Sequence, residues 1–314
     1  MAGYKEINGT NIEIRTSDPD NAIVGQVWYN LTTDVLKYKD PDGANTWATG
    51  GNLNTGRRLL FGTGTQSAAL ACAGLASFTP SGATELYNGS SWSEVNDLNA
   101  NRYQMAGFGT QSASIGCGGN PSSVLTESWN GTNWSEVNDL NTGRSYAKGV
   151  GIQTAGLIMG DSSGTETESW DGTNWTEVND LNTARYTAGA CGVQSSALFF
   201  GGANPFTGSA LTESWNGSSW SEVADLNTAR KEHKGAGESN SSGLCIGGTP
   251  MSPVGKCEEW NGSSWSEVND LIDTFFQGGA SGTKTLALAF GDAFSEPSTE
   301  EWSPVSGTKT IATD

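Results

Sequence analysis

The sequence predicts an all-β protein assembled from repeated units of four short strands. A segment of the type TESWNGTNWSEVNDLNTGR (126–144) recurs along most of the chain. The leucines that open the successive copies stand 41 to 45 residues apart. Glycine is abundant, with 43 among 314 residues, and only 16% of the residues are charged. This composition is typical of short strands and tight turns and argues against helices.

One copy, residues 140–180, shows how each strand arises. SYAKGVGI (145–152) predicts a first strand, a, and LIMGD (157–161) predicts a second, b. TESW (167–170) and WTEV (175–178) predict strands c and d, because the DGTN between them tolerates the positive φ angles of a tight hairpin. One such unit cannot bury its own faces. The units must therefore pack against one another around an axis, as the blades of a β-propeller do.

The repeats and the segment before them predict the domain organisation. Residues 1–22 are expected to form an arm that supplies a missing strand or docks elsewhere. Residues 23–52 are expected to form a partial blade or an appended hairpin module. The six full repeats, which together make one propeller domain, are 53–97, 98–139, 140–180, 181–225, 226–270 and 271–314.

The partial blade is predicted to supply strands b, c and d, at Val24–Asn30, Asp34–Tyr38 and Thr46–Thr49. Its register follows from Trp47, which precedes the leucine of the first repeat by the same interval as Trp92 precedes that of the second. We therefore expect seven blades, six full and one partial. A six-bladed ring with an N-terminal appendage is the alternative.

The repeat resembles the kelch motif, which has a Gly pair after strand b, then an aromatic residue, a Trp and an Arg. Gly118–Gly119, Gly201–Gly202 and Gly247–Gly248 are Gly pairs, and Gly160–Asp161 departs from the pattern. The turn between strands c and d is shorter than in kelch repeats, and Trp replaces the commoner Tyr. The resemblance implies a kelch-like β-propeller. It leaves the function open, because kelch propellers include enzymes as well as binding modules.

A second resemblance concerns the source of the chain. VGQVWYNLTTDVLKYKDPDGANTWATGGNLNT (24–55) is similar to a module at the start of structural and tail-associated proteins of bacteriophages, especially marine ones. This resemblance implies a virion protein of the tail, fibre or decoration type, which is assembled in the host cytoplasm. Its expected partners are other virion proteins and a host-surface glycan or protein, and an oligomeric assembly in the particle is expected. The alternative is a secreted or cell-surface propeller that binds carbohydrate.

Charge and motif content argue against several other classes. A net charge of −18 repels nucleic acid and anionic membranes, so we expect neither as a partner. No apolar run is long enough for membrane insertion. The five cysteines lack CxxC spacing and are expected to be buried thiols, with one Cys245–Cys257 bridge left open. His233 is the only histidine. We therefore expect no catalytic residue, metal site or cofactor, and no enzymatic activity.

The tryptophans and arginines of the repeat permit either a binding or a structural role. Repeated tryptophans can form a stacking platform, but a position shared by every blade favours packing between blades. A ring of arginines at one mouth of the channel can hold an anion, whereas pairing with Glu127, Glu168 or Glu213 is the structural interpretation, which we favour. The predicted structural tryptophans are Trp92, Trp129, Trp134, Trp170, Trp175, Trp215, Trp220, Trp260 and Trp265, and the arginines are Arg58, Arg102, Arg144, Arg185 and Arg230.

The loops between strands b and c are the best candidates for recognition. They alone differ freely in length and composition among the repeats, and the up-and-down order of the strands places them on one face. Neutral drift of surface loops is the alternative. Apolar tips on such loops suit contact with a partner. The predicted binding residues are Phe78, Asn120, Phe206, Met251 and Phe294.

Overall fold

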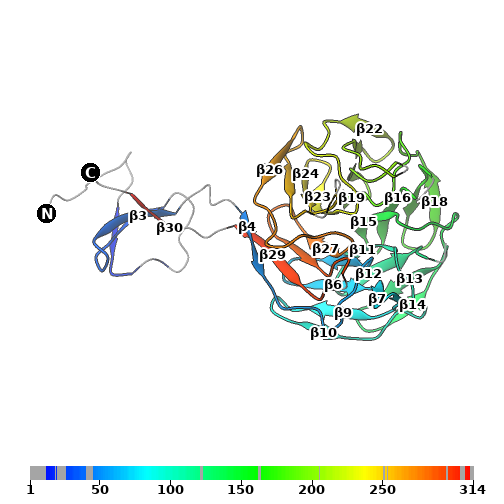
Figure 1. Ribbon diagram of the computed structural model, residues 1–314, viewed down its shortest axis with the longest axis horizontal. Helices are drawn as coiled ribbons and strands as arrows, with labels where there is room; N and C mark the ends of the chain where they lie inside the picture. The colour runs from blue at the N-terminus through cyan, green and yellow to red at the C-terminus, as the bar shows by residue number, and fades with distance from the viewer. Residues whose placement is uncertain are drawn as a thin grey trace. The chain divides into compact units, whose positions relative to one another are not determined.

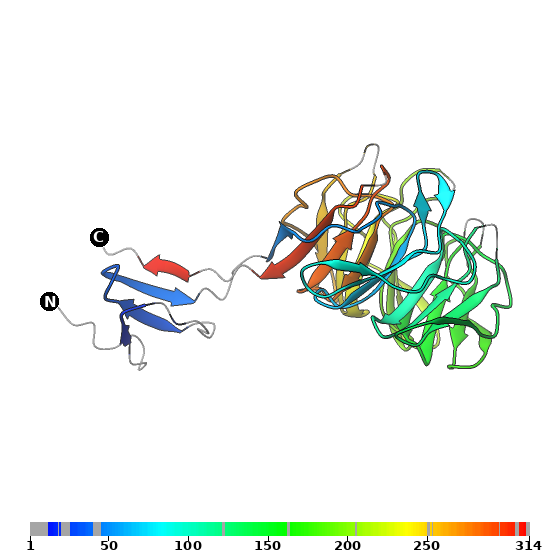
Figure 2. The same ribbon diagram turned by 90° about the horizontal axis from the view of Figure 1, so that it is seen from below.

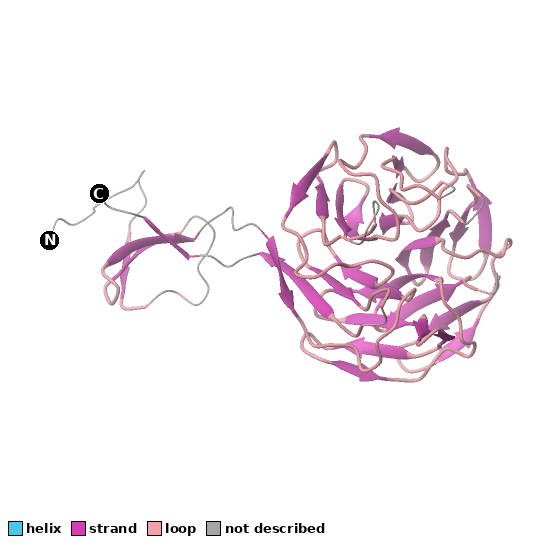
Figure 3. Cartoon of the chain, in the orientation of Figure 1, coloured by secondary structure: helices cyan, strands magenta, loops and turns pink. Residues whose placement is uncertain are grey.

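The described part of the chain contains strands and no helix, as predicted for an all-β protein (Figure 3). The computed structural model describes residues 12–17, 19, 26–39, 45–120, 123–161, 164–204, 206–249, 252, 254–294, 296–304 and 308–311. Two compact units divide the chain. The repeat unit is Thr46–Ser303, and the smaller unit combines Met1–Asn45 with Pro304–Asp314.

Most of the repeat unit consists of antiparallel sheets that follow one another along the chain (Figure 1). Each has the predicted strands a, b, c and d in that order, so the sequence periodicity gave the correct topology for these repeats. The sheets are β5 (Phe61–Gly64), β6 (Ala69–Cys72), β9 (Thr84–Tyr87) and β10 (Trp92–Glu94); β11 (Ala106–Thr110), β12 (Ala113–Cys117), β13 (Thr126–Trp129) and β14 (Trp134–Glu136); β15 (Lys148–Ile152), β16 (Ala155–Met159), β17 (Thr167–Trp170) and β18 (Trp175–Val178); β19 (Gly189–Val193), β20 (Ser196–Phe200), β21 (Thr212–Trp215) and β22 (Trp220–Val223); and β23 (Lys234–Ser239), β24 (Ser242–Ile246), β25 (Cys257–Trp260) and β26 (Trp265–Val268).

The last repeat obtains its fourth strand from the other end of the sequence. Its sheet has the order β27 (Gly279–Gly282), β28 (Ala287–Phe290), β29 (Thr299–Pro304) and β4 (Asn45–Thr49). Trp47 of β4 lies 5.3 Å from Trp302, ring centre to ring centre, compared with 5.4 Å for Trp129 and Trp134 in the second repeat. β4 thus takes the place of strand d, which the last repeat lacks because no second Trp segment follows Trp302.

This arrangement corrects the predicted partial seventh blade. Only the third of its three expected strands joins a sheet of the repeat unit. β2 (Val27–Asn30) and β3 (Val35–Lys39) instead form the sheet of the smaller unit, with β1 (Glu13–Arg15) and β30 (Thr308–Ile311). β1 runs parallel to β2, and the other neighbours are antiparallel. Trp28 and Leu36 are buried in this unit, which explains why β2 and β3 have the apolar pattern of blade strands.

The inner strands of the repeat unit pack side by side in the order β5, β11, β15, β19, β23 and β27, and β27 also lies against β5. Small residues allow this close approach. A Cβ atom at Gly107 would lie 2.1 Å from the Phe61 ring of the preceding sheet. The second strand of each sheet is the most deeply buried, so the core lies between neighbouring sheets.

The tryptophans predicted to be structural fill these spaces between sheets, and none of them is more than 6% exposed. The Trp that begins strand d reaches the preceding sheet. Trp134 Nε1, for example, donates to Thr84 Oγ1 at 3.0 Å, and Trp220 Nε1 donates to Thr167 Oγ1 at 3.3 Å. Trp92 and Trp265 make the equivalent bond, whereas Trp175 Nε1 is buried without a partner among the described residues. Burial of a large apolar surface is common to all these rings, as a packing role requires.

Candidate functional site

The repeated arginines lie inside the sheets, where each is paired with a glutamate of strand c. Arg102 Nη2 lies 2.7 Å from Glu127 Oε1, and Arg185 Nη2 lies 2.8 Å from Glu213 Oε1. Arg144 pairs with Glu168 and Arg230 with Glu258 in the same way. All of these side chains are 2% exposed or less. The arginines therefore do not offer their guanidinium groups to a ligand at the channel mouth.

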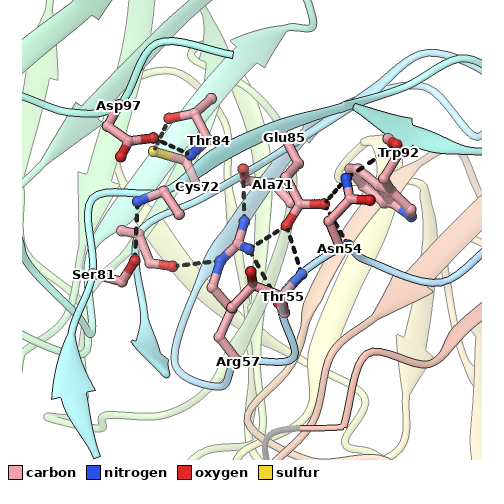
Figure 4. A network of polar contacts seen from close by, with 12 residues as sticks. Asn54, Thr55, Arg57, Ala71, Cys72, Ser81, Thr84, Glu85, Trp92 and Asp97 are labelled. Atoms are coloured by element: carbon pink, nitrogen blue, oxygen red, sulfur yellow. Dashed lines mark hydrogen bonds and ion pairs between the residues drawn. The ribbon is translucent and has the colours of Figure 1, made fainter. Parts of the chain in front are cut away.

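The first repeat corrects one of the predicted residues. Arg57, and not Arg58, is the buried arginine, and it pairs with Glu85. The register of LNTGR already indicated this, since Arg57 follows Leu53 as Arg144 follows Leu140. Figure 4 shows that Asn54 completes the arrangement, because its backbone N and its Nδ2 donate to Glu85 Oε2 at 2.7 and 2.9 Å. Both carboxylate oxygens have partners within the fold, as a structural network requires.

The b–c loops lie on one face, beside the segments that join strand d to the next strand a. Isolated bridges join Arg58 to Leu75, Tyr103 to Asn120, and Lys231 to Thr249. The longest of these loops forms its own hairpin, β7 (Leu75–Ala76) and β8 (Thr79–Pro80). Figure 2 shows this hairpin, in cyan, projecting from the repeat unit.

Phe78 and Phe294, two of the predicted binding residues, come together on this face although they belong to the first and the last repeat. They line one cavity of about 510 Å³. Arg58 and Phe276 also line it. The other lining residues are Ser77, Gln277 and Ala293. We call this cavity the aromatic pocket.

One side of the aromatic pocket is the tip of the β7–β8 hairpin. Ser77 and Phe78 occupy the two turn positions, with φ of 48° and 66°. The Phe78 side chain is 82% exposed. The Arg58 guanidinium carbon lies 4.9 Å from the centre of the Phe78 ring, and Arg58 Nη1 donates to the Ala293 carbonyl at 3.2 Å. The arginine thus links the first and last repeats at the pocket.

The opposite side is formed by Phe276 and Phe294, whose ring centres are 5.7 Å apart at an interplanar angle of 81°. Asp292 fixes the loop that carries Phe294. Its Oδ1 accepts hydrogen bonds from the backbone N of Phe294 at 2.8 Å and of Glu296 at 3.2 Å. Burial raises the pKa of Asp292 above its usual range. These bonds fix the backbone of the loop from which the Phe294 ring projects.

The other predicted binding residues lie elsewhere. Asn120 is half-buried, and its backbone N donates to Tyr103 O at 2.8 Å. Phe206 is 80% exposed but does not line the aromatic pocket. Met251 lies outside the described residues. Sequence reasoning missed Phe276, although a signal existed, because LIDTFFQ (271–277) departs from the LNTAR pattern at this point.

The side chains that most often perform catalysis are enclosed in the core. His233 is buried against Gly189 and Phe200, and burial together with the nearby Arg230 lowers its pKa well below the usual range. The five cysteines, including Cys245 and Cys257, are free and buried. Burial raises the pKa of Cys72 to about 12. Within the described ranges, His, Cys, Asp and Glu side chains form no group of three or more suited to a metal ion.

No helix in the described part of the chain is long and apolar enough to cross a membrane. Comparison with known proteins gave no family model and no curated protein that matches the chain.

Proposed function

We propose that this chain is a non-enzymatic, six-bladed kelch-like β-propeller that binds a partner through the face carrying its b–c loops. The blade number is supported by β4, which supplies strand d to the last repeat. Ring closure is supported by the packing of β27 against β5 and by Gln66 Nε2, which donates to Trp302 O at 2.6 Å. The equivalent Gln153 and Gln194 make the same bond between consecutive sheets, at 2.6 and 2.7 Å.

The observation that carries the proposed function is the aromatic pocket. A two-residue hairpin turn with positive φ at both positions favours Asn-Gly, because other side chains are strained there. Here the turn is Ser77–Phe78, and the Phe78 ring gains little burial in return. Strain of this kind is of the order of 1–3 kcal/mol and is concentrated at functional sites. We infer that the ring is retained for contact with a partner.

The chemistry of the pocket favours a surface glycan as this partner. Exposed phenyl rings offer flat apolar faces to the C–H faces of a sugar ring, and Arg58 offers donors to hydroxyl or carboxylate groups. A host-surface glycan fits the virion role that the resemblance of residues 24–55 implies. A secreted carbohydrate-binding propeller fits the same pocket and is the second candidate.

Binding to glycans tests the role of the pocket. We expect Phe78→Ala and Phe294→Ala each to weaken binding of the purified protein to a glycan array, or to intact host cells, by about tenfold or more, as loss of a central aromatic contact does. Phe206→Ala is the matched control, since it removes an equally exposed ring outside the pocket. Equal binding by all three variants would exclude the pocket as the recognition site.

The virion and the secreted candidate are separated by where the protein is found. Mass spectrometry of purified phage particles should detect this chain together with capsid and tail proteins. Its recovery from the culture fluid of uninfected cells, and its absence from particles, would favour the secreted protein.

A further inference from the structure

Two lysines meet at the centre of the repeat unit, at a site separate from the aromatic pocket. Lys148 is the first residue of β15, and Lys234 is the first residue of β23. Gly189 begins β19, the inner strand between them, and contributes no side chain at this position. Each amino group alters the pKa of the other, so the two lie close together, and Lys234 Nζ donates to the Leu60 carbonyl oxygen at 3.4 Å.

A ring of equivalent residues encloses the lysine pair. The sixth residue after each repeat leucine has a positive φ, between 54° and 63°, and these are Leu59, Gln104, Tyr146, Thr187, Glu232 and Gln277. Their backbones are linked around the axis. Gln104 N donates to Leu59 O at 2.9 Å, Tyr146 N to Gln104 O at 3.0 Å, and Glu232 N to Thr187 O at 2.8 Å.

Small cavities lie on both sides of the lysine pair. One, of about 20 Å³, is lined by the ring residues, His233 and both lysines. The next, of about 60 Å³, is lined by both lysines and by small residues of the inner strands, including Gly62 and Gly149. The same glycines also line a third, larger cavity of about 250 Å³. We therefore take this larger cavity as the route by which a small solute reaches the lysines.

With both lysines protonated, the charges around this cavity would not balance. Among the described residues neither lysine forms an ion pair, and Glu232 is the one carboxylate that lines the cavities next to them. Glu232 is already bound by Gln277 Nε2 at 2.9 Å and by Thr249 Oγ1 at 3.4 Å. Burial lowers the pKa of Lys148 to about 8, and burial with the neighbouring Lys148 lowers that of Lys234 well below its usual range.

An uncompensated polar group faces the same cavity. The Gln104 side chain is 8% exposed, and its Oε1 has no hydrogen-bond partner. Rotation of this amide by half a turn presents its NH₂ group to the cavity instead, and the two orientations fill the same space. The site then offers two amines and an amide as donors. Two adjacent amines in a poorly solvated space are stabilised as cations when an opposite charge lies beside both of them.

We infer that this cavity binds one small oxyanion, such as sulfate or phosphate, in contact with the amino groups of Lys148 and Lys234. Together with Glu232, the anion supplies the negative charge that two protonated amines require, and it accepts hydrogen bonds from both. The cavity volume restricts the ligand to this size. The other titratable groups near the pair are Glu232, His233 and Tyr146.

Calorimetric titration with sulfate tests the site, because the charge of sulfate is constant from pH 5 to pH 9. We expect Lys148→Met and Lys234→Met each to lower the affinity by tenfold or more. Lys284→Met is the matched control, since it removes the same charge from a surface lysine paired with Glu259. We also expect uptake of a proton with sulfate at pH 8, seen as a dependence of the heat on the buffer. Unchanged affinity in both the Lys148→Met and the Lys234→Met variant, or no binding of sulfate to the unmodified protein, would refute the site.

Chemical labelling of the lysine amino groups tests the inference without the Lys148→Met and Lys234→Met variants, which is needed if these do not fold. The unmodified protein is labelled with cyanate, a lysine-reactive reagent no larger than sulfate, in sulfate and in chloride of equal ionic strength, and the labelled residues are identified by mass spectrometry. Sulfate should protect Lys148 and Lys234 several-fold and leave Lys284 unaffected. Equal labelling of all three lysines in both salts would overturn the inference.

Discussion

The third and the last repeat differ in the contacts that fix the segment between strand d and the next strand a, which begins at Leu140 and at Leu271. In the third repeat, Glu168 accepts hydrogen bonds from the backbone N and the Nδ2 of Asn141, both at 2.9 Å, and pairs with Arg144. In the last repeat, Phe275 stands at the arginine position and Ile272 at the asparagine position. A regular repeat thus completes its network with side chains, and the last repeat does not.

Glu300 shows the consequence in the last repeat. It is buried, and among the described residues it accepts the backbone N–H groups of Ile272 at 2.8 Å and of Asp273 at 3.2 Å, with no arginine beside it. Burial raises the pKa of Glu300. The same repeat contributes Phe276 and Phe294 to the aromatic pocket. The comparison teaches that the shared residues maintain the scaffold, and that the pocket forms where the pattern is broken.

The largest effect is expected for the tryptophans of strand d. Trp134→Ala should lower the free energy of unfolding by about 3–5 kcal/mol, the usual cost of deleting a large buried aromatic side chain. Trp47→Ala should give a comparable loss, because β4 serves the last repeat as β14 serves the second. Urea-induced unfolding measures both. A much smaller loss for Trp47→Ala would mean that β4 is a loosely attached edge strand.

A second, smaller effect is expected when a regular network is broken. Arg144→Met leaves the Glu168 carboxylate buried without its partner, and we expect a loss of about 3 kcal/mol. Arg58→Met is the control, since Arg58 is half-exposed and belongs to no buried ion pair. Thermal and urea denaturation of the two variants should differ clearly. Equal stability would show that the buried pairs contribute nothing and that the last repeat loses nothing by lacking one.

The smallest effect concerns Asp292. Its pKa is raised in the folded protein, so folding stability falls as the pH rises from the unfolded value of about 3.9 to the folded one. Asp292→Asn keeps the Oδ1 acceptor and removes the charge. We expect it to stabilise the protein at pH 7 by less than about 1 kcal/mol. The gain should vanish at pH 3, where the Asp292 carboxyl group is mostly protonated in both the folded and the unfolded state. A gain independent of pH would contradict this explanation.

The sequence predicted the repeated sheets well because their signals are local. The Asn-Gly and Asp-Gly turns, the spacing of the tryptophans and the apolar second strands each specify one element within a few residues. The position of β4 was also visible, since Trp47 has the register of a strand d. Its partner was not, because pairing with β29 joins residues some 250 positions apart, and no local pattern encodes such a contact.

The candidate site was predictable only in part. The loop positions of Phe78 and Phe294 followed from variation among the repeats. Their meeting in one pocket depends on the first and last repeats being neighbours, which the periodicity does not specify. The lysine pair was missed because Lys148 and Lys234 are ordinary residues in the sequence. They become unusual only when the inner strands bring their amino groups together.

The attachment of β4 to the last repeat also has a consequence for folding during synthesis. Strand β4 leaves the ribosome before any of the six repeats, but its partner β29 is made only after the five complete sheets that lie between them in the sequence. Until then Trp47 has no sheet to join, and β29 has an unpaired edge. Contacts between such distant residues form slowly, and exposed strand edges promote aggregation. The pairing of these two strands is therefore expected to be a late step in folding, and to be the step at which a nascent chain is most exposed to pairing with a neighbour.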